Sequence, residues 1–491
     1  MKNKSLLTKQ ELLSAVNGVQ IGNAECFFCD VQTDSRELKN GDENDEYKAM
    51  FVPLVGEKQD GHKYITSALE KNPGVILLNN SEYNAKSEFY DELAKKHNNV
   101  CFIRVDNTLR ALQNASAAYT EKKCKNMIKV SITGSCGKTS TKEMLVSVCK
   151  EFFGKDKTAY TKGNLNSETG LPLSVFKIRG DEKIGIFEMG MNRVNEIAEI
   201  SNVLKSNYGI ITNIGTAHIG ILKSRENIAK EKRHSFDFIP ESGAAFVCID
   251  DDYADYCTKN VKGEIVKFGR NVPFEISGVK FLNDNGIFGT DFMIDDEKVH
   301  LGLAGEYNFQ NALAVIALAK KIGIDTVSIK KGLEKVCAAD GRMEICKTEL
   351  KNHKKSVLIK DCYNANLDSM LKVLDFSDSL DKKEFKKMIF VLADMKELGE
   401  ESEKFHKKIA EKINQINPDF VFLIGEEMRA CCEMLNNKNN VLYFTESSPK
   451  NFEIIGEKIL GITNGNDLIL LKGSHSMELE QLIPYFSFAG E

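Results

Sequence analysis

The sequence predicts an α/β protein with three domains, and two observations support this prediction. The chain has 491 residues, which is too long for a single hydrophobic core, because domains usually hold roughly 100 to 200 residues. Short apolar runs alternate with helical stretches along most of the chain, as in sheets that are covered by helices. The composition, with 42% hydrophobic and 28% charged residues, is that of an ordinary globular protein.

The first expected domain is a small α/β unit at residues 1–115. Apolar runs at 50–55, 74–79 and 101–105 are its strand candidates, and polar helical stretches separate them. The unit ends in a helical segment around NTLRALQNASAAY.

The second expected domain, residues 116–340, is a central domain with a mostly parallel sheet. Residues 271–301 change character, since Gly and Asn punctuate short alternating runs, and these predict a small antiparallel part. The helix NFQNALAVIALAKKIG closes the block. Three continuous apolar runs are typical of strands buried on both faces of a parallel sheet: MIKVSIT, KIGIFEM and YGIITNI.

The third expected domain, residues 341–491, is a Rossmann-like doubly wound sheet. Ligands of such sheets bind beyond the carboxyl ends of the strands, so Asp361, Asp394 and Lys472 are candidate binding residues. About five apolar runs, each followed by an amphipathic helix, predict its strands: SVLIKD, KMIFVLAD, DFVFLIG, VLYFT and DLILLKG.

Charge and targeting features exclude several classes of protein. A net charge of -5 gives no electrostatic basis for nucleic-acid binding. The N-terminal MKNKSLLTKQELL lacks the apolar core of a signal peptide, and no apolar run reaches the length of a membrane span. We therefore expect a cytoplasmic protein without a membrane span.

The cysteines predict reduced thiols rather than a disulfide framework. There are 13 of them, an odd number, and they are scattered along the chain. Cys26 and Cys29 form a C-x-x-C pair, but no second ligand pair with zinc-site spacing accompanies it. We expect both to be buried strand residues.

The segment TGSCGKT predicts a phosphate-binding loop, although Ile132 stands where the usual pattern has glycine. Gly134 and Gly137 permit a tight turn whose N–H groups face phosphate oxygens at a helix N-terminus. Lys138 would reach the outer phosphates, and the Thr139 hydroxyl would ligate Mg²⁺. A plain turn is the alternative. The expected ATP-binding residues of the loop are Gly134, Ser135, Cys136, Gly137, Lys138, Thr139 and Ser140.

Other polar residues allow both a functional and a structural interpretation. Glu188 ends a predicted strand and is a candidate Mg²⁺ ligand, or else a solvated strand-end carboxylate. His218 follows another strand and is a second metal candidate or a structural hydrogen-bonding residue. Asn308 and Asn311 lie one helical turn apart, where they suit a base edge or a helix cap. Lys232 lies in a helical segment where a charge is normally solvated.

Taken in order, these segments resemble the Mur ligases, ATP-dependent amide-forming enzymes of bacterial cell-wall precursor synthesis. Within that family the closest resemblance is to the MurF branch, which adds D-alanyl-D-alanine to UDP-N-acetylmuramoyl-tripeptide. The motifs D-x-YNAN-x-x-SM, DM-x-ELG and KTSTKEM are typical of this branch, and the DNPR-like motif of the diaminopimelate-adding ligases is absent. The resemblance spans nearly the whole chain through DSRELKNGD, TGSCGKTSTKEM, NLNSETGLP, FEMGMNRVNEI, NIGTAHIG, SRENIAKEK, GEYNFQNALA, GRMEI, DCYNANLDSM, LADMKELGEES and LKGSHSMELE.

The resemblance implies roles that spacing alone does not give. Glu188 and His218 would bind Mg²⁺, and Lys232 would be carbamylated and ligate a second Mg²⁺ ion. Asn308 and Asn311 would lie near the adenine. Arg342 and Asp361 would close over the nucleotide, with Asp361 near the ribose, and the implied catalytic set is Lys138, Glu188, His218, Lys232 and Arg342.

The resemblance also implies three places for the substrates. The first domain would hold the UDP part of the precursor, the loop after position 165 would lie beside its sugar-peptide part, and the C-terminal loops would receive the dipeptide. The implied residues are, in that order, Ser35 and Arg36; Asn166, Ser167 and Glu168; and Asn364, Asn366 and Asp394.

The implied reaction is amide formation through an acyl phosphate, carried out by a monomer. A ligase that adds one amino acid and a P-loop phosphotransferase are the alternatives. The third residue of the tripeptide and the tolerance for other dipeptides stay open. The effect of an insertion at 43–50 also stays open. The same holds for the effect of five departures from the family pattern: Tyr307, Leu367, Ala393, His475 and His234.

Overall fold

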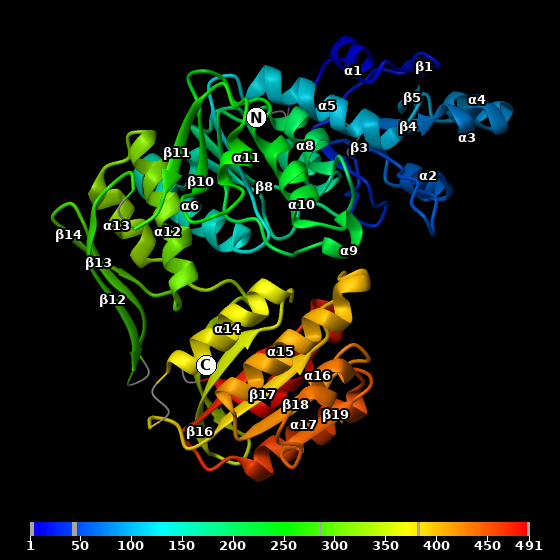
Figure 1. Ribbon diagram of the computed structural model, residues 1–491. Coiled ribbons are helices and arrows are strands. Elements are labelled where there is room, and N and C mark those ends of the chain that lie inside the picture. The colour runs from blue at the N-terminus through cyan, green and yellow to red at the C-terminus, as the bar shows by residue number, and fades with distance from the viewer. Residues whose placement is uncertain (1–3, 42–46, 271, 285–286, 381–382, 489–491) are drawn as a thin grey trace. The chain divides into compact units, whose positions relative to one another are not determined.

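A computed structural model describes residues 4–41, 47–270, 272–284, 287–380 and 383–488 (Figure 1). Residues 43–46 of the insertion at 43–50 therefore lie outside the described residues. The chain divides into two compact units, each described by itself below. Unit 1 comprises residues 1–131, 156–208 and 234–242, and unit 2 comprises residues 132–155, 209–233 and 243–491.

A five-stranded sheet forms the N-terminal part, in the order β1-β5-β4-β3-β2. β1 pairs antiparallel with β5, and the other pairs are parallel. Its strands are β1 (Val19–Ile21), β2 (Asp30–Gln32), β3 (Ala49–Phe51), β4 (Val75–Asn79) and β5 (Cys101–Val105). Its helices are α1 (Lys9–Val16), α2 (Ile65–Leu69), α3 (Asn80–Ala85), α4 (Ser87–Lys96) and α5 (Thr108–Lys123).

The predictions for this part were correct for three strands and wrong for the C-x-x-C pair. β3, β4 and β5 match the three apolar runs, whereas β1 (VQI) and β2 (DVQ) contain polar residues and form no apolar run. Cys26 and Cys29 lie between β1 and β2, outside any strand, and both are half-buried. The thirteen cysteines are all free.

A six-stranded sheet in the order β11-β10-β9-β6-β8-β7 forms the central part. Its strands are β6 (Ile128–Thr133), β7 (Thr158–Tyr160), β8 (Ile184–Glu188), β9 (Tyr208–Ile211), β10 (Ala244–Cys248) and β11 (Glu264–Phe268). The helices are α6 (Lys138–Phe153), α7 (Gly170–Val175), α8 (Glu196–Leu204), α9 (Ile219–Leu222), α10 (Arg225–Lys232), α11 (Ala254–Thr258), α12 (Glu306–Lys321) and α13 (Thr326–Glu334). The expected antiparallel part is also present, as β12 (Ile276–Asp284), β13 (Ile287–Ile294) and β14 (Glu297–Leu301).

The C-terminal part contains the predicted doubly wound sheet, in the order β19-β18-β17-β20-β16-β15-β21. The five expected strands are parallel: β16 (Lys355–Asp361), β17 (Met388–Ala393), β18 (Phe420–Ile424), β19 (Val441–Phe444) and β20 (Asp467–Lys472). Two antiparallel strands on the side of β16 were not predicted, β15 (Glu344–Leu350) and the edge strand β21 (Phe486–Phe488). Figure 1 shows α14 (Leu367–Ser379) and α15 (Ser402–Ile416) alongside these strands; α16 (Arg429–Met434) and α17 (Pro449–Ile462) complete the helices.

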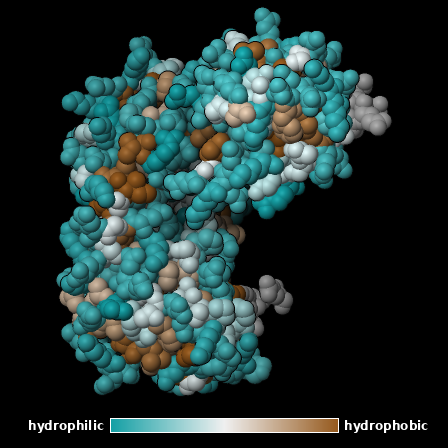
Figure 2. Space-filling model, turned by 90° about the vertical axis from the view of Figure 1, so that its right-hand side faces the viewer, coloured by the Kyte–Doolittle hydropathy of each residue, from teal (hydrophilic) through white to brown (hydrophobic). Residues whose placement is uncertain are grey.

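The cores follow from the apolar runs that predicted them. The strands β17 and β20 are buried at every residue, as expected for central parallel strands with helices on both faces. Hydrophilic residues cover most of the face seen in Figure 2, and hydrophobic residues form separate groups on it. Among the described helices, none is both long enough and apolar enough to cross a membrane. The predicted fold class, α/β with mostly parallel sheets and a small antiparallel part, is confirmed.

Candidate active site

The glycine loop joins β6 to α6, as the motif predicts, and its two glycines are required by close packing. Gly134 has φ +150° and Gly137 has φ +82°, where residues with a side chain are strained. A Cβ atom on Gly134 would lie 1.9 Å from Thr212 Oγ1, and one on Gly137 would lie 2.6 Å from Asn311 Oδ1. Only glycine fits at either position.

Two polar residues after β9 fix the shape of this loop. Thr212 Oγ1 donates to the Cys136 carbonyl at 2.6 Å, and Asn213 Nδ2 donates to the same oxygen at 2.9 Å. Asn213 Oδ1 accepts from the Cys136 N–H at 3.0 Å. Lys138 Nζ donates to the Gly134 carbonyl at 2.8 Å, so this lysine folds back over its own loop. A preformed loop at a helix N-terminus suits phosphate binding. Sequence patterns did not link Thr212 or Asn213 to the glycine loop, because both lie more than 70 residues from it in the chain.

Lys232, the last residue of α10, is only 1% exposed, whereas Lys230 is exposed. Burial lowers the pKa of Lys232 well below its usual value, and the nearby positive charge of Lys138 lowers it further. A buried lysine that loses its proton is a neutral amine, and a neutral amine can react with CO₂. The solvated helix face that spacing favoured for Lys232 is therefore wrong.

His218 precedes α9 and has φ +64°, a left-handed conformation. The pKa of His218 lies below its ordinary value, mainly because the ring is buried. Contact with Glu397 acts in the opposite direction, and the charges of Lys232 and Lys138 lower the pKa further. Its Nδ1 atom lies 2.7 Å from Glu397 Oε2 at ion-pair distance, although the angle is not that of an aligned hydrogen bond. A neutral imidazole is the form that binds a metal ion.

The donor set of unit 2 fits a metal ion only if Lys232 is modified. Among the described residues, no group of three or more His, Cys, Asp or Glu side chains is close enough to hold a metal. A carbamate on Lys232 would add two oxygen donors near His218, and the buried Thr139 hydroxyl at the start of α6 is a further donor. Oxygen donors are those that Mg²⁺ prefers. The residues present therefore fit Mg²⁺ when Lys232 carries a carbamate.

Glu188, in unit 1, is 2% exposed at the end of β8, so it is not a solvated strand-end carboxylate. Its Oε1 accepts from Asn166 Nδ2 at 2.8 Å, and its N–H donates to Thr161 Oγ1 at 3.2 Å. A Cβ atom on Gly190 would lie 3.0 Å from Asn166 Oδ1, so this glycine makes room for the amide. The structure thus brings together Glu188 and Asn166, one metal candidate and one substrate candidate.

The remaining substrate candidates of unit 1 are also held by neighbours. Glu168 Oε2 accepts from Arg193 Nε at 2.9 Å, and Ser167 Oγ accepts from the Gly170 N–H at 3.2 Å. In the N-terminal part, Ser35 and Arg36 lie in a turn after β2. The Asp34 carboxylate pairs with Arg36 at 2.6 Å and raises the pKa of its guanidinium. Arg36 is highly exposed, so it is accessible to an anionic ligand.

The two asparagines of α12 are buried and differ in their contacts. Asn308 Nδ2 donates to the Ala304 carbonyl at 2.8 Å, which is not a cap, because a capping side chain accepts from a backbone N–H. Asn311 packs against Gly137 of the glycine loop. Asn311 is therefore the member of the pair that adjoins the expected nucleotide site.

Asp361 and Arg342 both contact other residues of the C-terminal part. Asp361 Oδ2 pairs with Lys472 Nζ at 2.9 Å, and its Oδ1 accepts from the Met343 N–H at 3.1 Å. The Arg342 guanidinium lies 3.9 Å from the centre of the Tyr363 ring, which is a close cation–π contact. The strand-end candidates Asp361 and Lys472 thus form a single pair.

The dipeptide candidates have clear structural contacts. Asn366 caps α14, with its Oδ1 2.9 Å from the Ser369 N–H, and it also accepts from Cys136 Sγ at 3.4 Å. The Asn364 carbonyl accepts from Lys472 Nζ at 2.7 Å, while the residue itself is exposed. Asp394 is fully buried, and its carboxylate accepts from the Met428 N–H and from Lys396 Nζ, at 2.9 and 2.8 Å. Of these three, Asn364 is the one open to a ligand.

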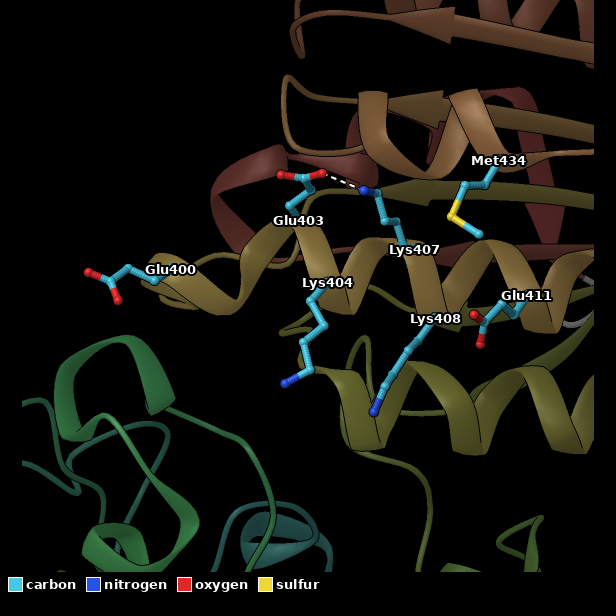
Figure 3. Close-up of a pocket in the computed structure, with 7 residues that line it drawn as sticks. All are labelled: Glu400, Glu403, Lys404, Lys407, Lys408, Glu411 and Met434. Carbon is cyan, nitrogen blue, oxygen red and sulfur yellow. Dashed lines mark hydrogen bonds and ion pairs between the residues drawn. The ribbon is translucent and has the colours of Figure 1, made fainter.

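A shallow hollow of about 390 Å³ along α15 is a solvated helix face rather than a site. Figure 3 shows Lys407 paired with Glu403, while Lys404 pairs with Glu401 at 2.7 Å. Glu400 points away from the other lining residues. The hollow is lined by Glu400, Glu403, Lys404, Lys407, Lys408, Glu411 and Met434.

The glycine loop between a parallel strand and a helix, with a doubly wound sheet after it, defines a nucleotide-binding α/β protein. The family profile of the Mur ligase middle domain matches residues 132–319, and that of the Mur ligase glutamate ligase domain matches residues 341–475. The UDP-N-acetylmuramoyl-tripeptide–D-alanyl-D-alanine ligase of Treponema pallidum is 33% identical over 98% of both chains. The Bacillus subtilis protein of the same name is 31% identical over 92% of both chains. The chain belongs to the Mur ligase family.

Solved structures agree with this assignment. A crystal structure of MurF from Acinetobacter baumannii has a TM-score of 0.81 and 25% identity, covering 97% of this chain and 98% of that one. MurF from Thermotoga maritima in complex with ADP has a TM-score of 0.73 at 22% identity, covering 93% and 96%, and this similarity concerns the fold. The resemblance inferred from the motifs is confirmed.

Proposed function

We propose that this chain joins D-alanyl-D-alanine to the terminal carboxylate of UDP-N-acetylmuramoyl-tripeptide, with cleavage of ATP to ADP and phosphate. The observation that carries the proposal is the similarity over 98% of both chains to a ligase of that name. The preformed glycine loop and the buried Lys232 within one compact unit support it, since they suit phosphate binding and a carboxylate-type metal ligand.

The chemistry follows from the poor electrophilicity of a carboxylate. A carboxylate oxygen of the tripeptide attacks the γ-phosphorus of ATP, and the bond from that phosphorus to the bridging oxygen breaks. ADP leaves, and the tripeptide now carries an acyl phosphate. The dipeptide amine then attacks the carbonyl carbon, loses a proton, and expels phosphate from a tetrahedral intermediate. Two anions meet in the first step, so cationic groups such as Lys138 are needed more than a nucleophilic side chain.

We propose that Mg²⁺ is held by Thr139, Glu188, His218 and a carbamate on Lys232. The neutral Nζ of Lys232 attacks CO₂, a C–N bond forms, and the nitrogen releases a proton to solvent. When bound, a pair of Mg²⁺ ions supplies positive charge that stabilises the transferring phosphoryl group. Asn308, Asn311, Arg342 and Asp361 are proposed to hold the nucleoside.

The proposed substrate residues form three groups, one for each part of the substrates. Ser35 and Arg36 hold the UDP part, Asn166, Ser167 and Glu168 adjoin the sugar-peptide part, and Asn364, Asn366 and Asp394 serve the dipeptide loops. The accessible Arg36 and Asn364 best support direct contact, whereas the enclosed Asp394 supports a role in shaping its loop. We also propose three domains at 1–115, 116–340 and 341–491, a cytoplasmic location that fits thirteen free cysteines, and a monomeric state.

A phosphate-release assay tests the reaction. With ATP, Mg²⁺, UDP-N-acetylmuramoyl-tripeptide and D-alanyl-D-alanine present, we expect release that stops when either amide partner is omitted. Mass spectrometry should then detect the pentapeptide product in the complete reaction. Phosphate release that is unchanged without the dipeptide would refute the ligase proposal and favour a phosphotransferase.

A further inference from the structure

Two carboxylates from the C-terminal part of unit 2 contact one short segment of its central part. This segment, residues 215–222, is called the histidine loop here because it contains His218. Asp368, in the first turn of α14, accepts through Oδ2 from the Thr216 N–H at 2.6 Å and from Thr216 Oγ1 at 2.7 Å. One carboxylate oxygen thus receives two hydrogen bonds from the loop.

Glu397 makes the second contact with the histidine loop. It lies just before the 3₁₀ helix η4 (Gly399–Glu401), and its carbonyl accepts from the Gly220 N–H at 2.9 Å. Its carboxylate lies 2.7 Å from Nδ1 of His218. The main chain of Glu397 therefore anchors the loop, and its side chain faces the histidine.

Two glycines of the loop allow these contacts. A Cβ atom on Gly215 would lie 2.3 Å from Asp368 Oδ2, and one on Gly220 would lie 2.6 Å from the Glu397 carbonyl oxygen. Neither glycine has a left-handed φ, so close approach, not backbone conformation, excludes a side chain there. His218, between them, does have a left-handed conformation, which persists only where its surroundings hold it.

We propose that Asp368 and Glu397 are positioning residues that hold the histidine loop, and so orient His218 for its metal. The inference rests on the proposed function, because it takes His218 as a Mg²⁺ ligand. Metal-binding histidines usually have a carboxylate or carbonyl beside the ring nitrogen that does not bind the metal. Glu397 beside Nδ1 leaves Nε2 as the metal-binding nitrogen.

This arrangement couples metal binding at His218 to the docking of the Asp368 and Glu397 segments on the histidine loop. The loop receives both carboxylates only when the Asp368 and Glu397 segments are docked on it. Metal binding and docking then favour each other, as linkage requires. Neither carboxylate was predicted as a functional residue, although each lies within a quoted motif, DCYNANLDSM and LADMKELGEES.

Hydrogen exchange and metal binding test the proposal on the full chain. The variants are Asp368→Asn and Glu397→Gln, with Asp375→Asn on α14 and Glu400→Gln next to η4 as controls. We expect amides of residues 215–222 to exchange at least about tenfold faster in the two test variants, because a charge-assisted hydrogen bond or ion pair is lost. Mn²⁺ affinity, measured by electron paramagnetic resonance, should fall about tenfold in the same variants, while both controls match the wild type.

A glycine variant tests the docking without changing a charge. In Gly220→Ala the new methyl group meets the Glu397 carbonyl, so exchange of the loop should again accelerate. Gly461→Ala is the matched control, because a Cβ atom there meets nothing within 4 Å. If Gly220→Ala unfolds, the two carboxylate variants still decide the question.

The outcomes separate this inference from the proposed function. Wild-type ligase activity combined with test variants that behave like their controls would overturn the positioning role alone. A second outcome is that the two test variants show faster loop exchange and weaker Mn²⁺ binding, while the wild-type protein itself has no ligase activity. This outcome would refute the proposed reaction and retain the positioning role. Full protection of the loop in Glu397→Gln and Asp368→Asn would end the proposal.

Discussion

Unit 2 contains three lysines that are each only 1% exposed, and two of them, Lys472 and Lys232, have different surroundings. Lys472, at the end of β20, pairs with Asp361 at 2.9 Å and donates to the Asn364 carbonyl at 2.7 Å. Lys232, at the end of α10, is influenced mainly by burial and by the charge of Lys138, and both lower its pKa. One buried lysine has an anionic partner, and the other faces a second cation.

This difference distinguishes a lysine with a structural pairing from a candidate reactive lysine. Lys472 pairs with the Asp361 carboxylate and so links β20 to β16. Lys232 is destabilised as a cation, and such groups cluster at functional sites. Burial alone therefore does not single out a candidate catalytic lysine, whereas burial beside another positive charge is typical of functional sites.

The largest expected effect comes from Lys232→Ala. Loss of a metal-ligand carbamate should reduce phosphate release at least about 1,000-fold, because a metal ion supplies several kcal/mol of transition-state stabilisation. Short carboxylic acids should restore part of the activity by replacing the carbamate oxygens. A carbamate signal from ¹³C-bicarbonate should appear in the wild type and vanish in the variant.

Lys230→Ala is the matched control, since Lys230 is exposed on the same helix. It should keep activity within about twofold. Full activity of Lys232→Ala would remove the distinction between the two buried lysines.

Lys472→Met should affect stability. It leaves the Asp361 carboxylate without its partner, so we expect a loss of about 3 kcal/mol in the free energy of unfolding, measured with urea. The double variant Asp361→Asn, Lys472→Met should recover much of this loss, because both charges are gone. Lys404→Met, which removes an exposed ion pair with Glu401, should cost less than about 1 kcal/mol. Equal losses in Lys472→Met and Lys404→Met would contradict a structural role for Lys472.

Gly137→Ala tests the loop that brings Lys138 close to Lys232. The methyl group would meet Asn311 and the backbone is left-handed, so ATP affinity should fall roughly 10- to 100-fold. Gly154→Ala shares a left-handed φ but has nothing within 4 Å of its Cβ, so it reports backbone strain alone. Equilibrium binding of a fluorescent ATP analogue should show the loss only in Gly137→Ala. Equal affinities in both variants would show that the packing of Asn311 on the loop is unimportant.

Sequence reasoning succeeded where the signal is continuous along the chain. The strand, glycine loop and helix around Lys138 occupy adjacent residues, and the five parallel strands of the C-terminal sheet are unbroken apolar runs. The antiparallel strand β15 was missed because its sequence, EICKTEL, is polar and only partly buried, so it forms no continuous apolar run. β1 was missed because its three residues, VQI, are mostly exposed or half-buried and form no apolar run.

The site was only partly predictable, because its partners are far apart in the chain. Thr216 and Asp368 are 152 residues apart, so no local pattern links them. The burial of Lys232 also depends on tertiary packing, and its role came from family resemblance rather than spacing. The roles of individual site residues, Asp394 included, stay predictions.

The smallest expected effect tests whether a lowered pKa alone marks function. His406 on α15 is fully buried, and burial lowers its pKa from the ordinary value of 6.5. Unlike Lys232, it has a partner at each ring nitrogen, since Nδ1 donates to the Ser402 carbonyl at 2.8 Å and Nε2 accepts from the Met395 N–H at 3.2 Å. It is therefore a scaffold residue that is neutral in the folded state.

The pH dependence follows from that neutral state. Below pH 6.5 the unfolded chain binds a proton that the folded chain does not, so stability falls as the pH drops. The slope contributed by His406 should approach about 1.4 kcal/mol per pH unit and vanish in His406→Gln. Urea unfolding between about pH 5 and 8 measures it: wild type and variant should run parallel above pH 6.5 and diverge below it. Parallel curves throughout would show that His406 takes up a proton in the folded protein as readily as in the unfolded chain, and that Nε2 does not hold the hydrogen bond from the Met395 N–H.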